Sequence, residues 1–173
     1  MKNLCRSSGS IFATFDFMRK ILFLIGVLML ANHTSAQVKL YAGESFDARI
    51  AYTFQNGLVY HGDAAFSNKI LFTVSENKIY IGRSTSSFDC LYTITQSNVY
   101  RGDSKFSSDI IYTIDDDKVY RGNSTFSSNC ILTLDDDKLY FGDSTFPSDL
   151  LITISGNSSE LTLAVLACIV GPY

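Results

Sequence analysis

The chain has 173 residues, of which 46% are apolar and 18% are charged, and its formal net charge is −3 at neutral pH. This length and apolar content suffice for one ordinary globular core. The negative charge excludes the basic surface that nucleic-acid binding requires, because such binding depends on lysine and arginine at the phosphates.

Residues 18–36 are typical of a signal peptide. Arg19 and Lys20 precede the ten-residue apolar run 21–30, and small polar residues follow that run. The run is too short to span a bilayer, so no stable membrane span is expected after cleavage. We therefore predict cleavage before Gln37 and an exported protein, either periplasmic or extracellular.

The segment that precedes this signal, residues 1–17, ends at a second methionine, Met18. We interpret it as an upstream extension that results from a misassigned start. Without the extension and the signal, the chain keeps ten basic and 16 acidic residues, a formal charge of −6. Binding to nucleic acid becomes still less favourable for the exported chain.

Residues 37–159 contain six tandem copies of one unit. Each copy begins with Tyr-x-Gly, and two successive copies read YRGDSKFSSDIIYTIDDDKV and YRGNSTFSSNCILTLDDDKL. The period is twenty residues except in the first copy, which is one residue shorter. The copies begin at Tyr41, Tyr60, Tyr80, Tyr100, Tyr120 and Tyr140. Because they follow one another without a linker, they predict a repeat array.

The second half of each copy predicts a β-strand. Residues 110–114 are β-branched and aromatic with a two-residue alternation. Turn formers follow, namely Asn56-Gly57 in one copy and the Asp triplets 115–117 and 135–137 in others. The next Tyr-x-Gly strand comes at once. Each unit therefore predicts a tight hairpin, joined to the next hairpin by a Gly-Asp-Ser-x-Phe-Ser loop.

The hairpins must bury their apolar faces against one another, because an isolated two-stranded hairpin is marginal in water. The sequence predicts an all-β fold in which the hairpins form either a closed ring or a short open solenoid. The repeated tyrosines and threonines would form ladders across the copies. In the third copy the loop phenylalanine, Phe88, is displaced by two positions, which predicts a local irregularity.

The last segment, residues 160–173, departs from the repeat. Asn157 is a candidate N-cap with Glu160 at the third helical position, and the apolar run 161–170 ends before Gly171-Pro172. This pattern favours a short buried helix that plugs the open end of the hairpin array. A strand is the alternative for an apolar run of this length.

The exported leader, the tandem copies with YTIDDDKVYRGNSTFSS and the short apolar tail together resemble the four-fold β-flower family of small exported bacterial proteins. The resemblance covers residues 38–170. It implies a closed, flower-like ring of hairpin petals about a pseudo-fourfold axis, and no assigned activity.

Two other repeat families are similar in outline. MORN repeats also carry Tyr-x-Gly-Asp/Glu, as in residues 60–63, but their second strand is rich in glycine, where this chain has IIYTI. Choline-binding cell-wall repeats are aromatic hairpins of twenty residues that depend on tryptophan cages, and this chain has no tryptophan.

Candidate catalytic chemistry centres on His61, the one histidine that remains after the signal is removed. It occupies the x of Tyr-x-Gly, where other copies carry alanine, isoleucine, arginine or phenylalanine, so an exposed strand position is favoured. A hydrolase that uses His61 with Asp63 is an alternative. Because GxSxG, HExxH and Cys-x-x-Cys motifs are missing from the sequence, we predict no enzyme, no catalytic residue and no cofactor.

The Asp triplets 115–117 and 135–137 suggest calcium, because hard cations bind clustered carboxylates. Consecutive residues in a tight turn point in different directions, however, and the equivalent segments 75–77 and 95–97 read SEN and TQS. We therefore predict solvated turns and no metal site.

The cysteines of the exported chain are Cys90, Cys130 and Cys168. Cys90 and Cys130 fill a repeat position that other copies fill with isoleucine or leucine, which favours small buried hydrophobic residues. A disulfide bridge that involves Cys168 is the alternative.

The repeated tyrosines are the feature best able to bind a ligand, because a ladder of aromatic rings can stack sugars or flat molecules. Packing between hairpins is the favoured alternative. The residues of this candidate site are Tyr60, Tyr80, Tyr100, Tyr120, Tyr140, Arg101 and Arg121. We predict an exported, non-enzymatic structural or interaction module of the bacterial envelope with an unknown protein or glycan partner. The alternative is a glycan- or cell-wall-binding module that uses the tyrosine ladder.

Overall fold

The computed structural model describes residues 37–43, 49–63, 67–157 and 159–171. The predicted extension and signal peptide lie outside these residues. The strands are β1 (Gln37–Ala42), β2 (Ile50–Gln55), β3 (Leu58–His61), β4 (Ile70–Ser75), β5 (Lys78–Ile81), β6 (Cys90–Ile94), β7 (Asn98–Arg101), β8 (Ile110–Asp115), β9 (Lys118–Arg121), β10 (Cys130–Asp135), β11 (Lys138–Phe141) and β12 (Leu150–Ser155). One α-helix, α2 (Leu163–Val170), follows the last strand.

Two-residue turns create most of the hairpins. Asp115 pairs with Lys118 across the turn between β8 and β9, and the equivalent pairs close the β2–β3, β4–β5 and β10–β11 turns. The first turn residue has a positive φ in each case, for example 52° at Asn56 and 51° at Asp116. Asn and Asp tolerate this conformation better than other non-glycine residues, so the turn sequences explain the hairpins.

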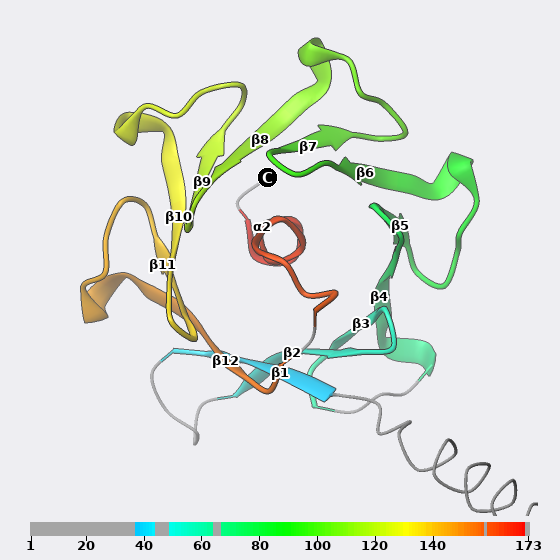
Figure 1. The fold of residues 1–173 in the computed structure, drawn as a ribbon. Coiled ribbons are helices and arrows are strands. Elements are labelled where there is room, and N and C mark those ends of the chain that lie inside the picture. Colours follow the sequence, from blue (N-terminus) through cyan, green and yellow to red (C-terminus); the bar gives the residue numbers. More distant parts are fainter. Residues whose placement is uncertain (1–36, 44–48, 64–66, 158, 172–173) are drawn as a thin grey trace, which may run out of the picture. The chain divides into compact units, whose positions relative to one another are not determined.

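The strands close into a ring. Each strand pairs with its neighbours in the sequence, and β1 pairs with both β2 and β12. Leu40 faces Ile154 and Tyr41 faces Thr153, so the two ends of the repeat array together make the sixth hairpin. The six petals surround α2, as Figure 1 shows. The prediction of an all-β hairpin-repeat ring is confirmed, and the open solenoid is excluded.

The repeated threonine and glycine form one recurring contact. The threonine hydroxyl donates to the glycine carbonyl at 2.7–2.8 Å, and the glycine N–H donates to a backbone carbonyl of the same hairpin. The threonines are buried or nearly so. Five contacts lie within a hairpin, and the sixth joins the last strand of the repeat array to the glycine after its first strand. The contacts are Thr53–Gly62, Thr73–Gly82, Thr93–Gly102, Thr113–Gly122, Thr133–Gly142 and Thr153–Gly43. We call these six contacts the threonine clamps.

Five loops between hairpins end in a short 3-10 turn within the described residues: η1 (Ser67–Lys69), η2 (Ser87–Asp89), η3 (Ser107–Asp109), η4 (Ser127–Asn129) and η5 (Pro147–Asp149). A serine hydroxyl in the loop bonds to the Asp or Asn that ends the turn, as in Ser84–Asp89 at 2.6 Å. The irregularity predicted at Phe88 is wrong for the backbone. Ser86 has φ −74° and ψ 140°, nearly the values at Phe106, because the loops have equal length.

The helix α2 lies at the centre of the ring (Figure 1). Six of its residues, 164–169, are buried, and they share one hydrophobic cluster with residues of the strands. A helix that is apolar on all sides has to be enclosed, so the predicted role as a plug agrees with this position. The predicted cap at Asn157 is wrong: Thr162 is the N-cap and accepts from the Val165 N–H at 3.4 Å. Residues 156–157 and 159–162 lie between the last strand and the helix.

None of the three cysteines within the described chain forms a disulfide bond. Cys90 and Cys130 are half-buried, as expected of small hydrophobic residues, and Cys168 lies inside the ring on α2. Burial raises the pKa of the Cys168 thiol from 9.0 to about 12. The helix found among the described residues is too short and not apolar over enough length to cross a membrane.

Replacing Thr153 or Thr133 by valine tests the threonine clamps. Each change keeps the side-chain shape and leaves the carbonyl of Gly43 or Gly142 without its hydroxyl donor. We expect the free energy of unfolding to fall by about 1–3 kcal/mol in each case, measured by urea denaturation. A change below about 0.5 kcal/mol in both variants would show that the clamps add nothing to stability.

The reactivity of Cys168 tests the position of α2. In a Cys90→Ser, Cys130→Ser background at pH 8, the raised pKa lowers the thiolate fraction of Cys168 by about 1,000-fold. We therefore expect maleimide to label this thiol only after denaturation. Since the unfolded chain loses the proton first, stability should also fall as the pH rises from 9 toward 12. Native labelling as fast as that of a free thiol would contradict an enclosed helix.

Candidate functional site

One rim of the ring carries a set of exposed side chains that follow the repeated tyrosines. Two positions before each of them is a core residue, such as Val99 or Val119, with no exposed surface. Side chains two apart on a strand point to the same face, so the exposed set continues the face that packs on α2. Its members, which we call the mouth residues, are Ala42, His61, Ile81, Arg101, Arg121 and Phe141.

The mouth lies at the carboxyl end of α2. Arg121 pairs in register with Tyr112, and a Cβ placed on Gly171, just after the helix, would lie 3.0 Å from the Tyr112 hydroxyl. Tyr112 is also part of the core cluster that contains the helix. The mouth residues therefore surround the end of the plug, and they differ in size, polarity and charge.

His61 packs beside an aromatic ring. Its ring centroid lies 6.4 Å from that of Tyr52, with the planes at 89°. The carboxylate of Asp63 accepts from the Lys39 ammonium at 2.6 Å. A hydrolase would need His61 and Asp63 to interact with each other. Instead, His61 packs on Tyr52 and Asp63 pairs with Lys39.

The repeated tyrosines do not form an exposed ladder. Tyr60, Tyr80, Tyr120 and Tyr140 are at most 8% exposed, and Tyr100 is half-buried. Tyr120, for example, lies in register between Thr113 of its own hairpin and Cys130 of the next. A sugar has no open tyrosine face to stack on at the four buried positions, and these rings pack the hairpins together instead.

The exposed aromatic rings are phenylalanines at the petal tips. Phe88 is 98% exposed, and Phe106, Phe126 and Phe146 are 70–76% exposed. Each belongs to a loop that precedes or forms a 3-10 turn. Their equivalents in the first two copies, Phe46 and Phe66, lie outside the described residues. The four exposed phenylalanines each lie in a different loop between petals. They are therefore separate exposed groups, spaced around the circumference of the ring of strands.

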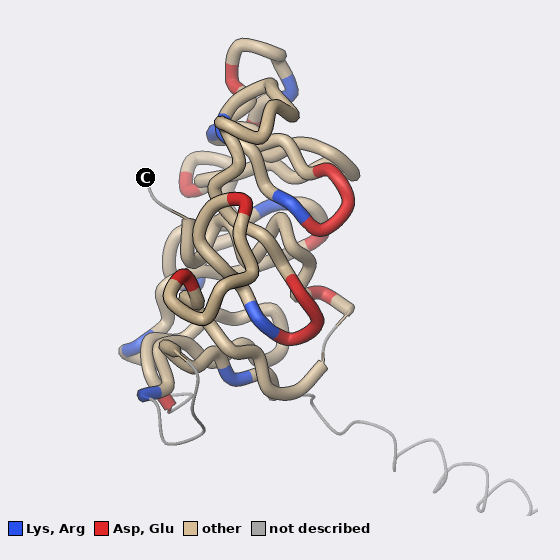
Figure 2. Tube along the Cα trace, turned by 90° about the vertical axis from the view of Figure 1, so that its left-hand side faces the viewer, with Lys and Arg blue, Asp and Glu red and all other residues tan. Residues whose placement is uncertain are grey.

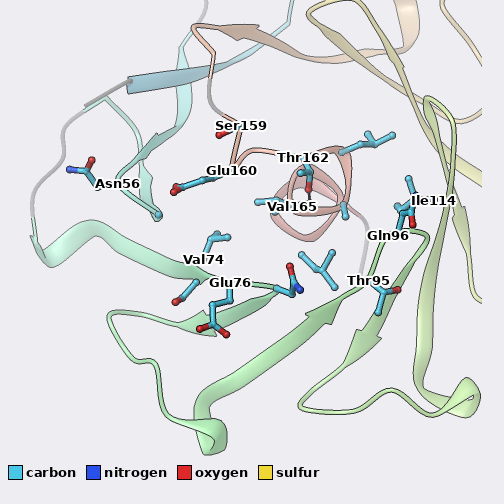
Figure 3. Close-up of a pocket in the computed structure, with 16 residues that line it drawn as sticks. Asn56, Val74, Glu76, Thr95, Gln96, Ile114, Ser159, Glu160, Thr162 and Val165 are labelled. Atoms are coloured by element: carbon cyan, nitrogen blue, oxygen red, sulfur yellow. Dashed lines mark hydrogen bonds between the residues drawn. The ribbon is translucent and has the colours of Figure 1, made fainter. Parts of the chain in front are cut away.

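A pocket of about 820 Å³ opens at the other end of the helix (Figure 3). Its floor is apolar and includes Val74, Ile114 and Val165, while its edge carries polar side chains from three hairpin turns and from the segment before α2. In Figure 3 the carboxylate of Glu160 points into the space between Asn56 and Val74. The polar edge residues are Asn56, Ser75, Glu76, Asn77, Thr95, Gln96, Ser159, Glu160 and Thr162.

The Asp triplets lie on exposed turns, as expected. The segments 115–117 and 135–137 are exposed, and Figure 2 shows the two long acidic turns projecting on the same side of the ring. No group of three or more His, Cys, Asp or Glu within the described residues could hold a metal ion. These aspartates act as turn formers.

Lysine–aspartate pairs join neighbouring petals. Lys78 lies 2.7 Å from Asp103, and equivalent pairs join Lys39 with Asp63 and Lys118 with Asp143. The hydrogen bond that the Lys78 ammonium donates to Asp103 raises the pKa of Lys78, so the ammonium stays charged. These lysines neutralise carboxylates close to the mouth residues.

Sequence reasoning missed two lining residues, Tyr92 and Tyr112. Together with Arg101 and Arg121 they border a cavity of about 390 Å³ at the mouth. The signal was present in the repeat, because Tyr92 and Tyr112 each precede the repeated threonine and pair with the mouth position. Recognising it requires the register between strands.

The family comparison agrees with this architecture. A family model described as 6-fold beta flower protein matches residues 40–168. The resemblance to a four-fold family was therefore right in the broad β-flower class and wrong in the number of petals, which equals the six copies in the sequence. No curated protein matches the chain. No solved structure matches it either.

Two aromatic substitutions in one repeat test which rings are structural. Tyr120→Ala removes a buried ring and should lower the free energy of unfolding by about 3–5 kcal/mol. Phe126→Ala removes a ring that is 76% exposed and should change it by less than about 0.5 kcal/mol. Urea denaturation measures both. Equal effects of the two changes would contradict the assignment of the tyrosines to the packing.

Proposed function

We propose that this chain, which belongs to the 6-fold beta flower protein family, is an exported, non-enzymatic binding module whose mouth contacts a partner in the cell envelope. The observation that carries the proposal is the contrast between two sets of side chains. The polar residues that recur in every copy hold the ring together, whereas the mouth residues vary from one petal to the next.

The recurring polar groups are occupied by structural contacts. All six repeated threonine hydroxyls serve in the threonine clamps. Loop serines bond to the Asp or Asn of the 3-10 turns, as Ser144 does to Asp149 at 2.5 Å. The recurring threonine and loop-serine hydroxyls are thus part of the scaffold, which favours binding over catalysis by these groups.

The mouth residues are suited to recognition. They stand on strands, at positions fixed by the closed ladder, so a partner would meet them with little loss of conformational freedom. Ile81 and Phe141 are each 54% exposed, and Arg101 and Arg121 add charge. Exposed apolar and arginine side chains on a rigid rim are typical of binding surfaces.

Export to the periplasm or the cell exterior is part of the proposal. It is supported by Arg19-Lys20 and the apolar run 21–30 of the sequence. An exported module of this kind would meet cell-wall glycan or another envelope protein.

Glycan binding in the pocket at the amino end of α2 is the second candidate function. The pocket is large enough for a sugar, and amide, hydroxyl and carboxylate groups surround its apolar floor. In this second function the glycan would bind in the pocket and not on the tyrosine ladder, since four of the ladder residues are buried.

Titration of isotope-labelled protein, residues 37–173, with soluble cell-wall glycan fragments tests the proposal. We expect amide shifts at the mouth strands, and Arg101→Ala with Phe141→Ala to weaken binding by about tenfold or more. Phe126→Ala at a petal tip is the control and should bind normally.

The site of the shifts decides between the two functions. Shifts confined to residues 56–57, 75–77 and 159–165, with loss of binding in Glu160→Gln, would favour the pocket. Saturating fragments that move neither set of amides would overturn binding of the wall by this module.

A further inference from the structure

We propose that Arg101 and Arg121, with the rings of Tyr92 and Tyr112, form a binding site for a small oxyanion, a carboxylate or a phosphate, carried on the partner of the mouth. This inference rests on the proposed function and adds the chemical class of its ligand. It depends on the arrangement of four side chains from four consecutive strands.

The strand register places these four residues on adjacent strands, with tyrosine and arginine alternating from strand to strand. Arg101 on β7 pairs with Tyr92 on β6, and Arg121 on β9 pairs with Tyr112 on β8. Strand β8 lies between β7 and β9, and its Tyr112 pairs with both Arg121 and Val99. The two arginines are therefore two strand spacings apart across the sheet and two residues apart along it, roughly 12 Å at the backbone. This distance is well within the combined reach of two arginine side chains. One ligand can therefore contact both guanidinium groups.

A cavity of about 390 Å³ lies at this position. Its lining consists of the four residues together with Ile110, Ile111 and Gly122. The volume falls in the range of small-molecule sites and suits a group no larger than a sugar ring. The tyrosine rings and isoleucines provide apolar walls, and the two arginines provide the charge.

The charge of the two arginines is available to a ligand. Among the described residues neither Arg101 nor Arg121 forms an ion pair, whereas Lys39, Lys78 and Lys118 each do. The carboxylate nearest in sequence to Arg101 is Asp103, which Lys78 holds at 2.7 Å.

The petal of Arg121 lacks that carboxylate. Its loop carries the neutral Asn123 where the neighbouring copies carry Asp103 and Asp143. Arg121 thus has no acidic residue two positions after it. At Arg101 that acidic residue, Asp103, is present but is neutralised by Lys78. The result is a local positive site on a chain whose exported form has a formal charge of −6.

Guanidinium groups are well suited to oxyanions. Their planar N–H fork matches a carboxylate or phosphate in two parallel hydrogen bonds, and they stack on aromatic rings. Tyr92 and Tyr112 would hold each arginine by its flat face. Two arginines that converge on one cavity can bind one oxyanion from both sides.

An alternative role for the arginines is purely structural. The carboxyl end of α2 lies next to Tyr112, and cations stabilise the partial negative charge of a helix end. This role predicts that neutral replacements lower stability without any effect on anions. The proposed site predicts loss of anion binding.

The test is titration of isotope-labelled protein with inorganic phosphate, glucuronate and glucose at low salt. We expect phosphate, glucuronate or both to shift the amides of residues 92, 101, 112 and 121, while glucose does not. The anion that binds more tightly identifies the source of the oxyanion. Raising the salt concentration should weaken binding, because the attraction is electrostatic.

Variants assign the effect to the pair. Arg101→Gln with Arg121→Gln should weaken anion binding by about tenfold or more, since charge-assisted hydrogen bonds are lost. Arg83→Gln is the matched control, because Arg83 is an exposed arginine outside the cavity lining. Arg121→Lys keeps the charge without the fork and should show an intermediate loss. Urea denaturation of every variant reports any change in stability.

Three outcomes would overturn the oxyanion site. They are no anion-dependent shifts at millimolar phosphate or glucuronate, an equal loss of binding in Arg83→Gln, and unchanged binding in the double variant. If the double variant does not fold, Arg121→Gln alone decides by the same criterion. Cell-wall fragments that still shift the mouth amides in the double variant would keep the proposed function and reject the oxyanion as its ligand.

Discussion

Closure of the ring by β1 and β12 is the constraint on which the rest of the structure depends. A hairpin alone is marginal, and an open row of hairpins would expose one unpaired strand at each end. Pairing of Tyr41 with Thr153 removes both edges, and the Thr153–Gly43 clamp repeats at the junction the contact found in every other petal. The junction is thus made of the same parts as the remaining wall, and the last petal forms only when both ends are present.

Closure also creates the interior that α2 fills. The strands turn one row of apolar residues toward the centre, and an empty centre would leave that row without contacts. The helix is apolar on all sides, and its residues join the strand residues in one cluster. Because the helix is only eight residues long, it leaves space at both ends of the ring. The polar pocket lies at one end and the mouth with its arginines at the other.

The repeat separates constant structural positions from variable positions at the mouth. Positions within the wall keep threonine, tyrosine and glycine, since the threonine–glycine clamp and the tyrosine–threonine pairing recur in all six petals. Positions at the mouth have solvent on one side and are free to vary. This difference explains how six similar units can carry a site that is not repeated, because the Arg101–Arg121 pair occurs in only two adjacent petals. In the function proposed for this ring, recognition therefore depends on the departures between copies.

The units of this protein follow from the sequence alone: six copies, tight hairpins at Asn56-Gly57 and the Asp triplets, and solvated acidic turns. The sequence also favoured a buried helix near residues 161–170 over a strand. These features depend on local conformational preference and on periodicity within about twenty residues, so they can be recognised without the fold. The folded structure was needed to show that β1 meets β12, that Tyr120 and three of its equivalents are buried, that Thr162 caps the helix, and that Tyr92 and Tyr112 lie beside the arginines. Those features depend on contacts between distant strands and on their register, because one strand's position decides which face of the next is covered.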